Sequence, residues 1–165
     1  MNTDKVEQLA AELGLLLQQK GYKVATAESC TGGGIAYAIT SVAGSSNWFE
    51  QSLVTYSNES KQHWLGVSYE TLALHGAVSE ATVTGMAEGL ARTTGAELCI
   101  AVSGIAGPGG GLPDKPVGMV WLAWNLNGKI DSHCFHFEGD RKEVREFSIE
   151  QALVGAISRI QSERS

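Results

Sequence analysis

Apolar residues at the start of the chain recur at the three- and four-residue spacing of one helix face. Asp4 and Glu7 stand at the spacing of a capping box, and Gly21 follows the last apolar position, where a helix ends readily. The pattern predicts a core-facing helix that begins at an Asp4 cap and stops at Gly21. Its apolar face comprises Val6, Leu9, Ala10, Leu13, Leu16 and Leu17.

Short apolar runs at 22–27, 52–56 and 97–103 predict strands. The run 97–103 is almost continuously apolar, which is the pattern of a strand covered on both faces. We therefore expect this strand at the centre of the sheet.

Two more strand patterns, 117–126 and 129–137, flank Asn127-Gly128. This residue pair suits a type I′ turn, in which both central residues need a positive φ. The two runs therefore predict an antiparallel hairpin, and apolar residues at helical spacing within 140–163 predict a closing helix.

The remaining segments between strands predict helices. Asn58 is the expected cap of one of them, and Ser79 opens the longest. Gly85 and Gly89 weaken the helical propensity of that longest segment, and we favour the interpretation that they permit close helix packing. The segments are 35–40, 58–65, 71–75 and 79–94.

The order of these elements predicts the fold class. Helices alternate with strands early in the chain and a hairpin follows, so we expect an α/β fold, a three-layer α/β/α domain whose mixed sheet contains a C-terminal β-hairpin. The length of 165 residues suits a single domain over 1–165.

Composition and charge narrow the classes of partner and the compartment. The chain has 12 Lys and Arg against 18 Asp and Glu, a net charge of −6, and no basic run, so no nucleic-acid partner is expected. No apolar stretch approaches the roughly 20 residues of a membrane span, and the N-terminus is acidic, so no membrane partner or secretion is expected. Three cysteines without paired spacing fit a reducing cytoplasm.

Ser29 lies just beyond the first predicted strand, which spans 22–27, and precedes a glycine-rich turn and a helix. Free backbone N–H groups gather at such a junction, so Ser29 is a candidate nucleophile, and the N–H groups of Thr31, Gly32 and Gly33 are candidate oxyanion donors. The ordinary alternative is that Ser29 or Thr31 only caps the helix. The chain also lacks a Gly-x-Ser-x-Gly elbow with a downstream acid and histidine.

A serine hydroxyl needs a base, and Lys61 is the candidate. Tyr56 ends the second predicted strand, and Lys61 lies in the helical segment that follows it. Burial lowers the pKa of a lysine and lets it accept a proton. The alternative is that Lys61 is an exposed helix charge, and only its combination with Ser29 favours catalysis.

A glycine-rich loop over 103–111 follows the most apolar predicted strand. Ligands of α/β sheets bind at the carboxyl ends of the strands, where this loop lies. It lacks the Gly-Lys-Ser/Thr of a triphosphate-binding loop, and a flexible connection is the alternative. Arg141 lies at a third junction between strand and helix, and its guanidinium is a candidate phosphate ligand. The alternative is that Arg141 is an ordinary surface charge.

Two other chemistries are weaker. Cys30 is a rival nucleophile because thiolates attack well, but it lacks a histidine partner. His133 and His136 are three residues apart on a predicted strand, so their side chains point to opposite faces. We expect no metal.

Six separated motifs together resemble the CinA C-terminal-domain family, in order and over nearly the whole chain. They are Thr26-Ala27-Glu28-Ser29-Cys30-Thr31-Gly32-Gly33, Tyr56-Ser57-Asn58 with Lys61, His75-Gly76-Ala77-Val78-Ser79, Ser103-Gly104-Ile105-Ala106-Gly107-Pro108-Gly109-Gly110, Lys115-Pro116-Val117-Gly118 and Gly139-Asp140-Arg141.

This resemblance implies a nicotinamide-nucleotide amidase that converts nicotinamide mononucleotide (NMN) to nicotinic acid mononucleotide and ammonia, without a cofactor or metal, in the salvage of pyridine nucleotides. It implies Ser29 as nucleophile, Lys61 as general base, Tyr56 as an accessory hydroxyl near that pair, and Ser103 as a polar group of the pocket. Many relatives have Thr at the position of Ser103. The residues that the resemblance assigns to nucleotide binding are Gly104, Ala106, Gly107, Gly109 and Arg141.

The resemblance also implies a homo-oligomer, with a dimer favoured. The alternative function is a catalytically silent module of the same family that keeps the nucleotide pocket or the oligomer interface. The intact set of Ser29, Tyr56 and Lys61 argues against it. Nucleotide binding without ammonia release would favour it.

Overall fold

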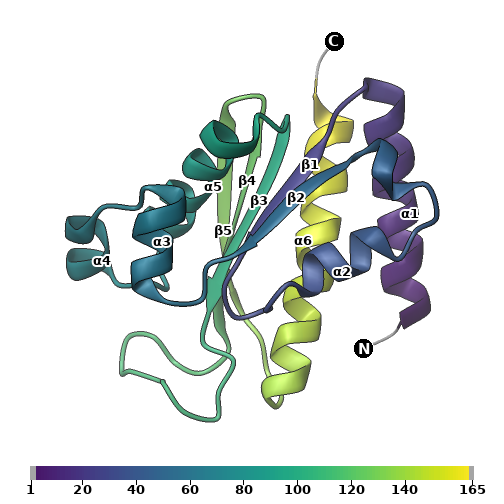
Figure 1. Ribbon diagram of the computed structural model, residues 1–165. Helices are drawn as coiled ribbons and strands as arrows, with labels where there is room; N and C mark the ends of the chain where they lie inside the picture. Colours follow the sequence, from purple (N-terminus) through teal and green to yellow (C-terminus); the bar gives the residue numbers. More distant parts are fainter. Residues whose placement is uncertain (1–2, 164–165) are drawn as a thin grey trace.

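The computed structural model describes residues 3–163 and contains a five-stranded mixed sheet in the order β2-β1-β3-β4-β5 (Figure 1). Strand β1 (Val24–Glu28) pairs in parallel with β2 (Phe49–Val54) on one side and with β3 (Leu98–Gly104) on the other. Strands β4 (Met119–Leu126) and β5 (Lys129–His136) continue the sheet in antiparallel fashion. The mixed sheet, its hairpin and the central place of β3 are confirmed.

Helices cover both faces of the sheet and complete the predicted α/β/α layers (Figure 1). On one face lie α1 (Thr3–Lys20), α2 (Gly34–Thr40) and α6 (Arg141–Ser162). On the other lie α3 (Asn58–Leu65), α4 (Tyr69–His75) and α5 (Glu80–Thr94), with α4 packed against α5. A single 3-10 turn, η1 (Ser45–Asn47), precedes β2.

The buried strand β3 supplies apolar residues to both faces, because successive side chains of a strand point in opposite directions. Leu98, Ile100 and Val102 belong to the core cluster under α1, α2 and α6, whereas Cys99 and Ala101 belong to the cluster under α5. All five are 0% exposed. This double burial explains why the sequence run is continuous rather than alternating.

Several element starts differ from the prediction. Ser57, not Asn58, caps α3, because its Oγ accepts the N–H of Ser60 at 3.1 Å and Asn58 is already helical. Asp4 lies inside the first turn of α1, whose cap position falls outside the described residues. The second strand begins three residues earlier than expected, at Phe49 instead of Ser52.

Other local predictions are confirmed. Ser79 caps α5 by accepting the N–H of Thr82 at 3.1 Å. The predicted closing helix forms as α6, and the capping box of Asp140 and Glu143 at its start was not predicted. The hairpin turn has φ of 52° at Asn127 and 91° at Gly128, as a type I′ turn requires.

Gly89 confirms the close packing that we favoured for α5. A Cβ at Gly89 would lie 1.8 Å from the carbonyl oxygen of Leu65 on α3, whereas a Cβ at Gly85 would make an ordinary contact of 3.5 Å with Val67. Only Gly89 therefore has to be glycine for α3 and α5 to touch.

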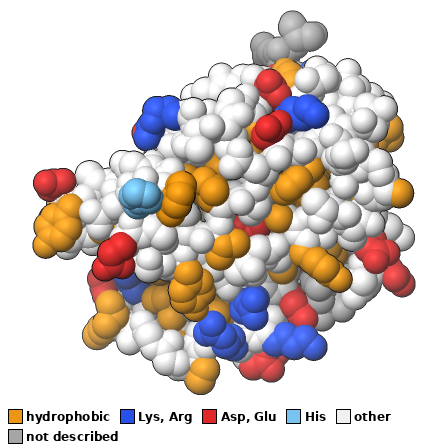
Figure 2. Space-filling view, in the orientation of Figure 1, with side chains coloured by type: hydrophobic (Ala, Val, Ile, Leu, Met, Phe, Trp, Pro, Cys, Tyr) orange, Lys and Arg blue, Asp and Glu red, His pale blue; other side chains and the backbone are white. Residues whose placement is uncertain are grey.

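The surface and helix lengths of the described residues add two observations. No helix within 3–163 is long and apolar enough to cross a bilayer. On the face shown in Figure 2, basic side chains near the lower edge lie beside acidic ones.

Candidate active site

The carboxyl ends of the three parallel strands bring the predicted residues to one edge of the sheet. Glu28 on β1 is in register with Val54 on β2 and Val102 on β3. The next residue on each strand or its extension is therefore Ser29, Thr55 and Ser103. Ser103 is buried, and the carbonyl of its neighbour Val102 accepts the N–H of Ser29 at 3.2 Å.

Lys61 lies against Ser29 in the interior. Helix α3 delivers its side chain into the protein, where the residue is 0% exposed. The Lys61 Nζ is 3.1 Å from the Ser29 Oγ, 2.8 Å from the carbonyl oxygen of Thr55 and 3.0 Å from that of Tyr56. Lys61 is therefore a buried partner of Ser29 and not an exposed helix charge.

The surroundings of Lys61 favour a neutral amine. Burial lowers the pKa of Lys61 to about 8, because the ammonium form loses its hydration. A neutral amine has two hydrogens and one lone pair. With both hydrogens donated to the carbonyls of Thr55 and Tyr56, the lone pair faces the Ser29 hydroxyl. This geometry suits proton transfer from Ser29 to Lys61.

Tyr56 contacts the pair through its backbone carbonyl, whereas its hydroxyl contacts Arg141. Its carbonyl accepts from Lys61 and lies 3.4 Å from the Ser29 Oγ. The residue is 60% exposed, and its hydroxyl accepts from the Arg141 Nη2 at 3.3 Å. No hydrogen bond joins this hydroxyl to Ser29 or Lys61 within residues 3–163, and the accessory role that the resemblance implied for it stays a prediction.

The turn after Ser29 is held by its own backbone. The N–H of Gly32 donates to the Ser29 carbonyl at 3.0 Å, so this candidate oxyanion donor already has a partner. No hydrogen bond joins the N–H groups of Thr31 or Gly33 to another of the described residues. Helix α2 begins after Gly33, without a side-chain cap, so neither Ser29 nor Thr31 is the helix cap.

Glu28 is a site residue that the sequence reasoning missed. It is 0% exposed, and its carboxylate accepts four hydrogen bonds at 2.7–2.9 Å. The donors are the hydroxyls of Thr26 and Thr31 and the N–H groups of Ile35 and Ala36. Glu28 thus joins the Ser29 turn to the first turn of α2. A charged residue at the end of an otherwise uncharged strand was the available signal.

Arg141 brings the glycine-rich loop to the site. Its Nη1 donates to the Gly107 carbonyl at 2.9 Å, and its Nη2 contacts the Tyr56 hydroxyl. A pocket of about 610 Å³ lies between this loop and the start of α6. Its lining residues are Ala106, Pro108, Val117, Gly139, Asp140, Arg141 and Lys142.

The other two loop residues assigned to binding are placed differently. A Cβ at Gly104 would lie 2.6 Å from the Val120 side chain on β4, so this glycine permits close strand packing. Gly109 is exposed, and a Cβ there would meet nothing within 4 Å. Neither residue lines the pocket beside Arg141.

The rival chemistries find little support in the described residues. Cys30 is buried, and burial raises the pKa of its thiol to about 11, so the thiol is protonated at neutral pH. Within residues 3–163, no three His, Cys, Asp or Glu side chains are grouped as a metal site would need.

Comparisons with known proteins agree with this architecture. A family model described as the CinA C-terminal domain matches residues 6–160. The chain is 49% identical over 154 residues to "Nicotinamide-nucleotide amidohydrolase PncC" of Pseudomonas putida, which covers 93% of this chain and 96% of that protein. It is 47% identical over 154 residues to the protein of the same name from Escherichia coli (strain K12), with 93% of each covered.

A solved structure gives the same result for the fold. The competence damage-inducible protein A (ComA) from Klebsiella pneumoniae subsp. pneumoniae MGH 78578 superposes with a TM-score of 0.94 at 39% identity. The superposition covers 96% of this chain and 99% of that one. The resemblance drawn from the motifs is thereby confirmed, and the chain belongs to the CinA C-terminal domain family.

Proposed function

We propose that the protein is an amidohydrolase that converts NMN into nicotinic acid mononucleotide and ammonia, with Ser29 as nucleophile and Lys61 as general base. The observation that carries the proposal is the fully buried Lys61 amine, 3.1 Å from the Ser29 hydroxyl. The name shared by the relatives from Pseudomonas putida and Escherichia coli supports the reaction and the substrate.

In the first half of the reaction, neutral Lys61 takes the proton of Ser29 while Oγ attacks the carboxamide carbon. A C–O bond forms and the carbonyl π electrons move to oxygen, which becomes an oxyanion. Backbone N–H groups of the turn stabilise it, and Thr31 and Gly33 have N–H groups free to do so. Lys61 then gives its proton to the leaving nitrogen, the C–N bond breaks and ammonia departs.

The second half regenerates the serine. Lys61, neutral again, takes a proton from a water molecule whose oxygen attacks the acyl carbon. The ester bond to Ser29 breaks, Lys61 returns the proton to Oγ, and the new carboxylic acid releases its own proton to solvent, so that nicotinic acid mononucleotide leaves as its carboxylate. One base therefore serves both steps because each begins with a proton transfer to the same lone pair.

Arg141 supports the choice of a mononucleotide. Its hydrogen bonds go to two uncharged acceptors, the Gly107 carbonyl and the Tyr56 hydroxyl, and no carboxylate within residues 3–163 forms an ion pair with it. Arg141 therefore lines the pocket with no anionic partner among the described residues. A phosphate is a suitable anion for that position.

The test is the formation of ammonia and nicotinic acid mononucleotide from NMN by the purified protein, beside Ser29→Ala and a chelator-treated sample. We expect equal amounts of both products, no turnover in Ser29→Ala and no effect of the chelator. Undiminished turnover in Ser29→Ala would overturn the mechanism. NMN binding without product would overturn the reaction and favour a silent nucleotide-binding module.

A further inference from the structure

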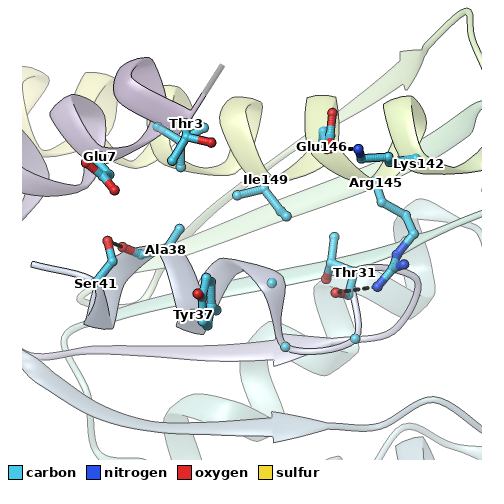
Figure 3. Close-up of a pocket in the computed structure, with 14 residues that line it drawn as sticks. Thr3, Glu7, Thr31, Tyr37, Ala38, Ser41, Lys142, Arg145, Glu146 and Ile149 are labelled. Atoms are coloured by element: carbon cyan, nitrogen blue, oxygen red, sulfur yellow. Dashed lines mark hydrogen bonds and ion pairs between the residues drawn. The ribbon is translucent and has the colours of Figure 1, made fainter. Parts of the chain in front are cut away.

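Arg145 contacts the back of the nucleophile turn. It lies one helical turn after Arg141 on α6, and its side chain extends toward Thr31 (Figure 3). The Arg145 Nε donates to the Cys30 carbonyl at 3.0 Å, and Nη2 donates to the Thr31 carbonyl at 3.4 Å. Neither the Ser29 hydroxyl nor Lys61 forms a hydrogen bond with it.

Arg145 and Lys61 approach the turn after Ser29 from opposite faces of the sheet. Arg145 approaches from the layer of α1, α2 and α6, whereas Lys61 approaches from α3 in the opposite layer (Figure 1). A pocket of about 560 Å³ opens on the Arg145 side, lined by Gly32, Gly33 and Arg145 among others, but not by Ser29 or Lys61. Arg145 is therefore reached from a space separate from the Ser29–Lys61 pair.

Peptide geometry links the two sides. The carbonyl and the following N–H of a trans peptide point in opposite directions because the unit is planar. With the Cys30 carbonyl held toward α6, the N–H of Thr31 has to point away from α6. The next peptide shows the same effect, because Arg145 binds the Thr31 carbonyl while the N–H of Gly32 turns back to the Ser29 carbonyl.

We propose that Arg145 is a positioning residue for the reaction: by holding the Cys30 and Thr31 carbonyls, it aims the N–H of Thr31 at the oxyanion that forms on the Ser29 side. This inference rests on the proposed amidase function. An arginine suits the task because one planar guanidinium reaches two neighbouring carbonyls at once, which the single ammonium of a lysine does less well.

The test is the kinetics of Arg145→Ala with NMN. Loss of one oriented oxyanion donor is expected to lower kcat about 100-fold. KM should change little, because Arg145 does not line the pocket beside Arg141. Guanidinium ion at a concentration that leaves the protein folded should restore part of kcat by entering the 560 Å³ pocket, and Arg145→Lys should fall in between.

Arg159→Ala is the matched control. Arg159 also lies on α6 and binds a backbone carbonyl, that of Gly155 at 3.1 Å, but it packs over Trp124 away from the turn. The kcat of Arg159→Ala should equal that of the unsubstituted protein, and guanidinium should not change it. An Arg145→Ala protein that is folded by circular dichroism and keeps the full kcat would overturn the inference. So would a loss of kcat that neither guanidinium nor Arg145→Lys relieves.

A second readout separates this inference from the choice of substrate. A fluorophosphonate forms an O–P bond with a serine nucleophile and expels fluoride, and it needs an oxyanion donor but no nucleotide pocket. We expect Arg145→Ala to slow labelling of Ser29 about as much as it lowers kcat. If NMN proves not to be the substrate, slow labelling would still support the inference. Labelling at the rate of the unsubstituted protein would overturn it.

Discussion

Lys61 is a buried lysine whose three hydrogen-bond partners carry no formal charge. Hydrogen bonds to two carbonyls and one hydroxyl offset only part of the hydration free energy that an ammonium loses on burial. The neutral amine is therefore more strongly favoured in Lys61 than in a lysine exposed to water. The residues that hold Lys61 thereby also make it a base at moderate pH.

The pH dependence of kcat/KM tests this directly. In the proposed mechanism neutral Lys61 is the active form, and burial lowers its pKa to about 8, so kcat/KM should rise about tenfold per pH unit below that value and level off above it. The measurement is the rate of ammonia release from NMN between about pH 6 and pH 10. A flat profile through pH 8, or the same rising limb in Lys61→Met, would contradict the assignment.

Arg141→Ala tests the phosphate contact. Removing a charged hydrogen-bond donor should cost the phosphate-bearing substrate about 2 kcal/mol and the riboside, which lacks the phosphate, almost nothing. The quantity to compare is the ratio of kcat/KM for NMN to that for the riboside. Tyr56→Phe is the matched variant, because it removes only the hydroxyl that Arg141 contacts, and its effect on the ratio should be smaller. An unchanged ratio in Arg141→Ala would rule out the phosphate contact.

Glu28→Gln should destabilise the fold. An amide can accept at only one of the two carboxylate oxygens, so buried donors among Thr31, Ile35 and Ala36 lose their partner, at a cost of about 3 kcal/mol. Urea unfolding measures the loss in the free energy of unfolding. Glu59→Gln, at an exposed position in the first turn of α3, should change it by less than about 0.5 kcal/mol. Equal values for the two variants would refute the role of Glu28.

At the scale of elements, the contact between α3 and α5 supports the site, because α3 carries Lys61. Gly89→Ala would place a Cβ 1.8 Å from the Leu65 carbonyl oxygen and force the two helices apart. We expect a loss of about 3 kcal/mol in the free energy of unfolding, together with a fall in kcat as Lys61 moves from Ser29.

Gly85→Ala is the control for Gly89→Ala on the same helix. Its Cβ would meet Val67 at 3.5 Å, an ordinary contact, so the better helix former should stabilise the protein by up to about 1 kcal/mol. Thermal unfolding of both variants gives the comparison. If Gly85→Ala and Gly89→Ala shifted the thermal stability in the same direction, the close approach at Gly89 would be unimportant.

Elements with a strong pattern were predictable from the sequence, and strand β2 shows why a boundary in a weak pattern was not. Strand β2 was expected over 52–56 but spans Phe49–Val54. It is an edge strand with half-exposed side chains, so its pattern is weak. Thr55 and Tyr56 leave the strand, and their carbonyls turn to the Lys61 amine instead. The boundary is thus set by a tertiary contact that local sequence does not encode.

At the scale of the whole molecule, the sequence could predict that Ser29 and Lys61 lie near each other, because parallel strands bring their carboxyl ends to one edge of the sheet. The contacts of Glu28 and Arg145 were not, because they depend on how α2 and α6 pack against the turn. The contact of the Tyr56 hydroxyl with Arg141 was not predictable either, because Arg141 lies 85 residues away in the sequence. The homo-oligomeric state and the cytoplasmic location stay predictions.

The central claim is that Ser29 forms a covalent acyl intermediate with the help of Lys61. The measurement that tests it most directly is rapid acid quenching of the protein during NMN turnover, followed by mass spectrometry of the peptide that contains both Ser29 and Cys30. We predict the mass of the nicotinoyl mononucleotide on Ser29, absent in Ser29→Ala. An adduct on Cys30, or turnover at full rate without any adduct when product release is not limiting, would contradict it.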